Sequence, residues 1–200
     1  MKVGFIGAGR MGRPMVARLV EAGHDVRVLG RSAEKRAAIA QLGAKAVADT
    51  ADLAAQTDAV VVCVFTDEQV QQVCLDGDLL KTMESGSAIV VHTTGNPRTV
   101  EAIAAHVASH DIGVVDAPVS GGPHNAAAGA LTLFVGGADD AVARVRPVLS
   151  CYGDPVLHVG ALGAGQKVKL VNNALFAAHI GLLSSAVELG ARLGVPESTL

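Results

Sequence analysis

The N-terminal segment carries three glycines at a spacing that suits the binding of a phosphate anion. They follow a short apolar stretch and precede a helical pattern at Pro14–Ala22. The first glycine of such a set permits a tight turn, the second lets the backbone approach a pyrophosphate, and the third lets the helix pack against the strand. Free amides at the helix start then face the phosphates. We predict a dinucleotide site here, with a ligand-free turn as the alternative. Its residues are Gly7, Gly9, Arg10, Met11 and Gly12.

The residues after the second strand-like run indicate which dinucleotide would bind. Chains that hold the ribose of NAD usually carry a carboxylate about 20 residues further on, at the end of that strand. Arg31 and Ser32 stand there instead, and Arg36 follows one helical turn later. A guanidinium binds a 2′-phosphate through paired, charge-assisted hydrogen bonds. The sequence therefore favours NADP(H) over NAD(H); the alternative is a solvated helix start.

A lysine and an asparagine stand four residues apart in an apolar stretch further along the chain. Lys169 and Asn173 share one face of the long helix expected from Gln166 to Leu193. Burying an amine is costly unless it is paired or used, and desolvation lowers the pKa of an amine toward the range of acid–base catalysis. Lys169 can then exchange a proton with a substrate oxygen while Asn173 orients it. The alternative is a lysine that reaches water, as we expect for Lys167.

Two further polar segments follow apolar strand-like runs. Ser120, Gly121 and Gly122 come after the run Gly113–Val115, and small residues at the carboxyl end of a strand can hold a carboxylate. An ordinary loop is the equal alternative. Thr94 follows another apolar run, so it is a candidate for contact with the cofactor, or else a helix N-cap.

Composition limits the class of protein. The chain has 200 residues, of which 50% are hydrophobic and 2% aromatic, and a net charge of −3. These values fit one domain or slightly more, without a basic face for nucleic acid. The three cysteines lack metal-ligand spacing, so we predict no metal site and a reducing, cytoplasmic compartment. No apolar run of 18 residues without a charge or breaker stands out, so no membrane span is predicted.

Strand-like and helical runs alternate along residues 1–162, which predicts a doubly wound, Rossmann-type parallel sheet. A glycine-rich hinge at 160–165 separates residues 163–200, expected to form the long helix and the start of a largely missing all-α domain, with Ser198 as an N-cap. The strand-like runs are Val3–Ile6, Asp25–Leu29, Ala59–Val64, Ala88–Val91, Gly113–Val115, Leu131–Val135 and Val156–Val159. The helical runs are Pro14–Ala22, Ala33–Leu42, Leu53–Gln56, Glu68–Cys74, Arg98–Ser109 and Asp139–Leu149.

Three motifs together resemble the β-hydroxyacid dehydrogenase family, which includes 3-hydroxyisobutyrate dehydrogenase and 6-phosphogluconate dehydrogenase. The first is the glycine run Gly7–Gly12. The second is Asp-Ala-Pro-Val-Ser-Gly-Gly at Asp116–Gly122, with Gly-x-Leu-Thr downstream at Gly129–Thr132. The third is Gly-x-x-x-Lys-x-x-Asn-Asn at Gly165–Asn173. Their order and spacing make the resemblance specific, and it extends over the whole chain.

The resemblance implies hydride transfer between NADP(H) and a small 3-hydroxyacid or its semialdehyde. Lys169 would be the general acid/base and Asn173 would assist, while Ser120–Gly122 would hold the substrate carboxylate. Val64 and Phe65 stand where the family commonly has a Leu-Pro pair near the nicotinamide. The resemblance also implies a helical C-terminal domain that closes the cleft and forms a homodimer.

The chain departs from the family pattern at the expected substrate end. The family usually has Gly-Ala after a gap of two residues beyond Ser-Gly-Gly, whereas this chain has Pro123-His124-Asn125-Ala126. The sequence therefore leaves the identity of the substrate open. His124 is a possible substrate contact, with a solvated loop histidine as the alternative. An alternative function is that of an imine reductase of the same fold. Lys169 argues against it, because such enzymes usually have another residue at this position. A non-catalytic NADP-binding scaffold protein is the alternative from another class.

Overall fold

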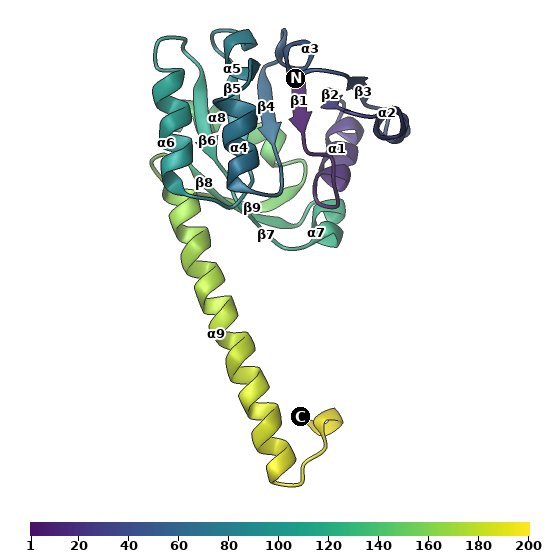
Figure 1. The fold of residues 1–200 in the computed structure, drawn as a ribbon, viewed down its shortest axis with the longest axis vertical. Coiled ribbons are helices and arrows are strands. Elements are labelled where there is room, and N and C mark those ends of the chain that lie inside the picture. The colour runs from purple at the N-terminus through teal and green to yellow at the C-terminus, as the bar shows by residue number, and fades with distance from the viewer.

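The computed structural model describes all residues from 1 to 200, as a sheet with helices on both faces and one long projecting helix (Figure 1). The strands are β1 (Lys2–Ile6), β2 (Asp25–Leu29), β3 (Lys45–Val47), β4 (Ala59–Val62), β5 (Ala88–Val91), β6 (Gly113–Asp116), β7 (Val119–Ser120), β8 (Leu131–Gly136) and β9 (Gly153–Gly160). The helices are α1 (Gly12–Glu21), α2 (Ala33–Ala40), α3 (Thr50–Ala54), α4 (Asp67–Cys74), α5 (Leu79–Thr82), α6 (Pro97–His106), α7 (Pro123–Ala128), α8 (Asp139–Leu149), α9 (Ala164–Arg192) and the 3-10 helix η1 (Glu197–Thr199).

The strand order confirms the Rossmann-type fold. The sheet runs β3-β2-β1-β4-β5-β6-β8-β7, and β9 pairs with β8. Strands β1 to β6 pair in parallel, whereas β8 is antiparallel to both β6 and β7, so the sheet is mostly rather than wholly parallel. The order reverses between β1 and β4, where the connections leave toward opposite sides. A ligand crevice is expected at the carboxyl ends of these two strands.

Valine-rich strands form the centre because a parallel sheet is buried on both faces. Ala59 and Val61 of β4 belong to one hydrophobic cluster, and Val60 and Val62 belong to the other. The first cluster includes side chains of α1, α2, α7 and α8, and the second includes side chains of α3 to α6. The alternation along a single strand thus fixes which helices cover which face.

Cap chemistry shifts several helix boundaries from those expected. The side chain of Asp49 accepts a hydrogen bond from the amide of Asp52, so α3 begins before the expected Leu53. Gln56 has a φ of 57°, which a helix cannot contain. Asn96 caps α6 by accepting from the amide of Arg98, so the alternative that Thr94 is the N-cap is wrong.

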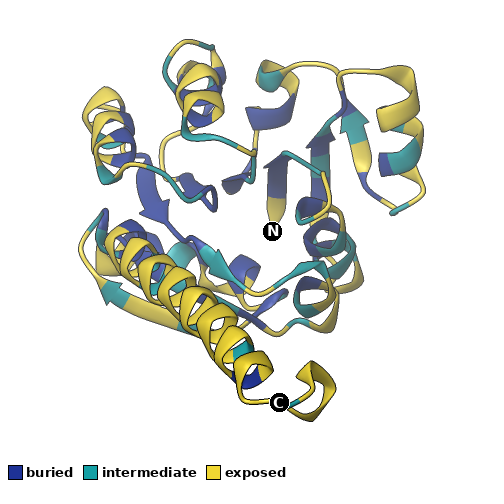
Figure 2. Cartoon of the chain, turned by 60° about the horizontal axis from the view of Figure 1, so that its bottom comes forward, coloured by how far each residue is buried: buried dark blue, intermediate teal, exposed yellow.

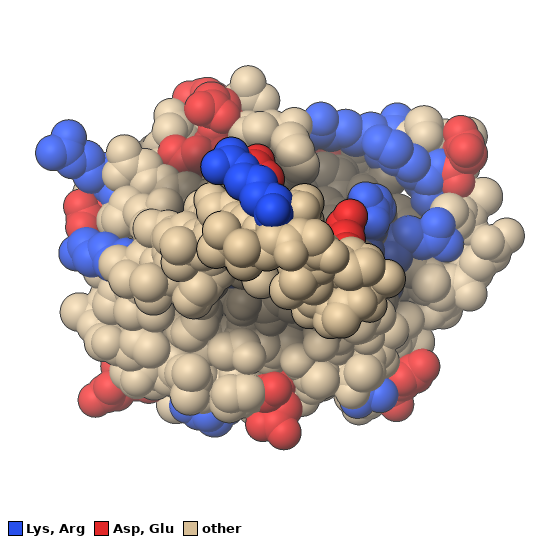
Figure 3. All heavy atoms as spheres, turned by 90° about the horizontal axis from the view of Figure 1, so that it is seen from below, with Lys and Arg blue, Asp and Glu red and all other residues tan.

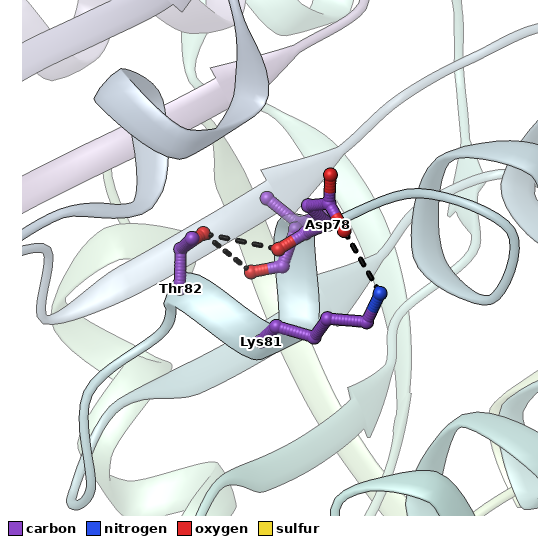
Figure 4. A network of polar contacts seen from close by, with 4 residues as sticks. Asp78, Lys81 and Thr82 are labelled. Atoms are coloured by element: carbon purple, nitrogen blue, oxygen red, sulfur yellow. Dashed lines mark hydrogen bonds and ion pairs between the residues drawn. The ribbon is translucent and has the colours of Figure 1, made fainter.

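Four short elements, β3, β7, α5 and α7, lie outside the strand-like and helical runs that the sequence indicated. Helix α5 is held locally, as Figure 4 shows. The ammonium of Lys81 lies 2.8 Å from the Asp78 carboxylate, and the hydroxyl of Thr82 donates to the carbonyls of Asp78 and Leu79. The ion pair is exposed, so solvent weakens it and these backbone bonds define the turn.

Helix α9 projects from the domain, and nearly all of it beyond its first turn is exposed (Figures 1 and 2). Phe176, Leu182 and Leu183 are between 65 and 67% exposed. By length and composition alone α9 could cross a membrane, since an 18-residue window in it has a mean hydropathy of 1.5. A helix that packs under further protein passes the same test.

The tail returns to the end of α9. Leu200 lies against Gly190, which is buried there. Pro196 precedes η1 and Ser198 lies inside it, so the expected N-cap role of Ser198 is wrong.

Candidate active site

A cavity of about 1070 Å³ opens where the carboxyl ends of β1 and β4 diverge. Its volume lies just above the usual range for ligand pockets, about 300 to 1,000 Å³. It contains most of the residues that the sequence assigned to the cofactor. These are Gly7, Gly9, Arg10, Met11, Gly12, Arg31, Val64, Phe65 and Thr94.

The three glycines occupy positions that only glycine fits or that face open space. Gly7 has a φ of 102°, and a Cβ there would collide with the carbonyl of Cys63. A Cβ on Gly12 would collide with the carbonyl of Gly7, whereas nothing lies within 4 Å of a Cβ on Gly9. Met11 provides no capping side chain and the first turn of α1 has no acidic residue, so its free amides suit an anion.

The segment after β2 divides the predicted ribose contacts into two groups. Arg31 lines the cavity, but Ser32 and Arg36 do not. The hydroxyl of Ser32 accepts from the amide of Lys35, which makes Ser32 the N-cap of α2. The guanidinium of Arg36 donates to the carbonyl of Gly30 at 3.0 Å. In this structure Ser32 and Arg36 therefore stabilise the start of α2.

Basic groups dominate this end of the cavity. Figure 3 shows Lys and Arg side chains gathered on the side of α1 and α2. Arg13 and Lys35 join the predicted contacts, although the sequence interpretation did not assign them a role. The charged residues that line the cavity are Arg10, Arg13, Arg31, Glu34 and Lys35.

The predicted substrate segment borders the same cavity. Val119 and Pro123 line the cavity on either side of Ser120–Gly122. Ser120 pairs with Thr132 across β7 and β8, which joins the second motif to its downstream part. Gly121 has a φ of 121°, in the region that favours glycine.

One predicted carboxylate contact needs correction. The amide of Gly122 donates to Oδ1 of Asn125 at 2.9 Å, so this amide is not free to hold a substrate. The departure from the family pattern at Asn125 therefore closes one donor of the loop. The exposed ring of His124 lies against Gly122, and its substrate role stays a prediction.

A buried histidine that the sequence interpretation left unassigned forms part of the cavity wall. Nδ1 of His92 lies 2.6 Å from the carbonyl of Ala117 and Nε2 lies 2.9 Å from the hydroxyl of Tyr152. A carbonyl only accepts, so Nδ1 carries the proton and the tyrosine donates to Nε2. The neutral ring thus ties β5 to the start of the substrate segment. Burial lowers the pKa of His92 to about 4, because the charged ring would be desolvated.

The first turn of α9 is attached to the sheet through Asp116. Its buried carboxylate accepts from the amides of Gly163 and Gln166, each at 2.7 Å. Burial raises the pKa of Asp116, and these amide bonds oppose the rise. The Gln166 side chain in turn bonds to the loop that contains Thr93, which lines the cavity.

Lys169 lies one turn beyond this attachment. Its side chain is half-buried, has no hydrogen-bond partner, and has a pKa lowered by desolvation. Asn173 and Lys167 are exposed; this agrees with the expectation for Lys167 and corrects the expected apolar surroundings of Asn173. Neither Lys169 nor Asn173 lines the cavity. Lys169 lies one helical turn from Gln166, whose side chain bonds to the carbonyl of the cavity-lining residue Thr93.

Known proteins match this chain over most or all of its length. Residues 2–160 match the family described as the NAD binding domain of 6-phosphogluconate dehydrogenase. A 2-(hydroxymethyl)glutarate dehydrogenase from Eubacterium barkeri is 35% identical, covering 100% of this chain and 67% of the relative. The chain belongs to the β-hydroxyacid dehydrogenase family. Within this family of NAD(P)-dependent oxidoreductases, it spans 59 to 67% of the length of the curated relatives.

Solved structures agree with this family and fold. The structure of Mycobacterium tuberculosis 3-hydroxyisobutyrate dehydrogenase with L-serine has a TM-score of 0.91 and 32% identity, covering 98% of this chain and 66% of that one. An imine reductase from Myxococcus stipitatus has a TM-score of 0.85 at 21% identity, covering 98% and 67%. At that identity the imine reductase shares the fold alone.

The His92 geometry predicts a loss of stability in acid. The pKa of the folded-state ring lies below the ordinary value of 6.5, so its contribution is present above pH 6.5 and is lost as the pH falls toward about 4. The pKa difference corresponds to about 3 kcal/mol of unfolding free energy. The double variant His92→Phe, Tyr152→Phe should show a weaker dependence of the unfolding free energy on pH. Urea unfolding at about pH 7, 5.5 and 4.5 measures this, since each pKa unit corresponds to roughly 1.4 kcal/mol. His106→Phe, which alters an exposed ring, is the control; an unchanged acid slope in the double variant would contradict the prediction.

Proposed function

We propose that this chain transfers a hydride between NADP(H) and a small 3-hydroxyacid or its semialdehyde, with Lys169 as the general acid/base. The observation that carries the proposal is the unpaired, half-buried amine one turn from the attachment of α9 to the cavity wall. When bound, the nicotinamide supplies or accepts the hydride.

The residues of this chain supply position and a proton. In reduction, the carbonyl carbon of the substrate gains a hydride and its oxygen takes a proton from the Lys169 ammonium, which becomes a neutral amine. In oxidation the neutral amine removes the hydroxyl proton. Desolvation lowers the pKa of Lys169, which makes both states accessible nearer to neutral pH than for a free lysine.

The remaining contacts are assigned by the same reasoning. Ser120 and Gly121 hold the substrate carboxylate beside the cavity, and Asn173 orients the reacting oxygen once the cleft is covered. The amides at the start of α1 hold the pyrophosphate. Arg31 binds the 2′-phosphate, since no carboxylate ends β2 and the basic groups of the cavity gather there.

The exposed apolar face of α9 completes the proposal. A homodimer through the helical region would cover side chains such as Phe176 and Leu183. The proposed location is the cytoplasm.

Lys169→Ala should abolish turnover, because the proposal assigns the proton transfer to this amine alone. NADPH binding should persist, since Lys169 does not line the cofactor cavity. The measurement is NADPH absorbance with a panel of small semialdehydes and 3-hydroxyacids, together with NADPH fluorescence. Lys167→Ala, two residues away and exposed, is the matched control. Full activity of Lys169→Ala would overturn the assignment, and binding without turnover in the unaltered chain would favour a scaffold protein.

The direction of the Lys169 pKa shift predicts opposite pH profiles for the two directions. Reduction needs the ammonium, so its kcat should fall as the pH rises through a value below 10.5. Oxidation needs the neutral amine, so its kcat should rise over the same interval. Steady-state rates measured in both directions from pH 6 to 10 (roughly the interval that brackets a lowered lysine pKa) check this. Profiles that run in parallel would count against Lys169.

Arg31→Ala should weaken NADPH binding by about 10- to 100-fold through loss of charge-assisted hydrogen bonds, with little change for NADH. Titration of both dinucleotides by fluorescence measures the ratio. Arg98→Ala, on exposed α6 surface away from the cavity, is the control and should leave the ratio unchanged. An equal loss for the two dinucleotides would remove the argument for the 2′-phosphate.

A further inference from the structure

Gln166 is a buried polar side chain whose hydrogen-bonding groups connect two parts of the molecule. The residue is 1% exposed. Its Nε2 donates to the carbonyl of Thr93 at 2.8 Å, and its Oε1 accepts from the amide of Gly95 at 2.9 Å. Both ends of the amide are therefore bound to the loop after β5. A leucine of similar size would leave that amide and that carbonyl without a partner.

The loop that Gln166 holds is itself bonded to the neighbouring cavity wall. The hydroxyl of Thr93 donates to the carbonyl of Val64 at 2.9 Å and accepts from the amide of Val64 at 3.1 Å. Thr93 and Val64 both line the cavity. A continuous set of hydrogen bonds thus runs from α9 through the loop after β5 to the loop after β4.

The two attachments of α9 constrain different movements. Asp116 binds amides of the first turn, which fixes where the helix begins. The side chain of Gln166, bound at both ends, adds a restraint on rotation of the helix about its own axis. Because residues three apart lie on neighbouring positions of one helix face, this restraint also acts on the backbone that carries Lys169.

The rest of α9 offers little alternative support. Beyond Gln166, its residues are mostly exposed, and Gly190 is buried only against the tail. Within this chain, the direction of the amine therefore depends on the first turn.

We infer that Gln166 is a positioning residue that aligns Lys169 with the cofactor cavity by binding Thr93 and Gly95. The inference rests on the proposed function, because it gives Lys169 the proton-transfer role. Gln166 does not touch the reacting atoms; it acts through the helix that carries Lys169.

The test compares Gln166→Leu, which removes both bonds, with Gln166→Glu, which keeps the acceptor for Gly95 and loses the donor to Thr93. Lys167→Gln, the adjacent exposed position, is the matched control. A misaligned amine should lower kcat by about 10- to 100-fold. NADPH affinity and substrate KM should stay within about twofold, because misorientation of a catalytic group lowers kcat and kcat/KM together. Gln166→Glu should lie between Gln166→Leu and the unaltered chain.

Two further measurements keep the result interpretable. Hydrogen–deuterium exchange of the peptide at 163–172 should accelerate in Gln166→Leu while the peptides of β1 and β4 stay protected, which shows that the domain is folded. Lys169→Ala is assayed in parallel.

If Lys169→Ala is inactive and both Gln166 variants keep full kcat, the inference is wrong and the proposed function stands. If Lys169→Ala is fully active, the proposed function fails first. A loss of NADPH binding as large as the loss of kcat would also overturn the inference, since it would indicate a general structural role.

Discussion

The carboxylate of Asp116, buried at the end of β6, is the interaction on which the arrangement of the site depends. A buried charge is stable only when hydrogen-bond donors replace the water around it. The amides of Gly163 and Gln166 are these donors. These amides are among those that a helix start leaves unpaired, so each group satisfies the other. The bond therefore joins the Rossmann-type sheet to the helix that carries the proposed acid.

Close approach around Asp116 explains why small residues surround it. A Cβ on Gly165 would collide with the carbonyl of Phe134 and with the Asp116 carboxylate, and a Cβ on Gly136 would collide with the same carboxylate. Close packing, rather than flexibility, therefore requires glycine at position 165 of this chain. The pairing of Asp116 with Gly136 across β6 and β8 brings the start of the motif Asp116–Gly122 next to the strand that begins within Gly129–Thr132.

The sequence was informative wherever a pattern depends on the backbone alone. Alternating valine runs and the glycine spacing at Gly7–Gly12 predicted the sheet, the crevice and the glycine-rich part of the cavity lining, since these follow from burial and close packing. Side-chain partners were not predictable. Whether the Arg36 guanidinium binds a phosphate or the Gly30 carbonyl, and whether the Gly122 amide is free or bonded to Asn125, depends on three-dimensional contacts. Short elements such as β3 and α5 were also missed, because three or four residues show no periodicity.

The length of α9 gives its two ends different sensitivities to movement. A helix of 29 residues is about 43 Å long. A change of about 10° in direction at its base would carry the far end through roughly 7 Å, but would displace the backbone at Lys169 by only about 1 Å. A change in the direction of α9 would therefore displace whatever packs against its distant part, while Lys169, the proposed proton donor near its base, would stay almost in place.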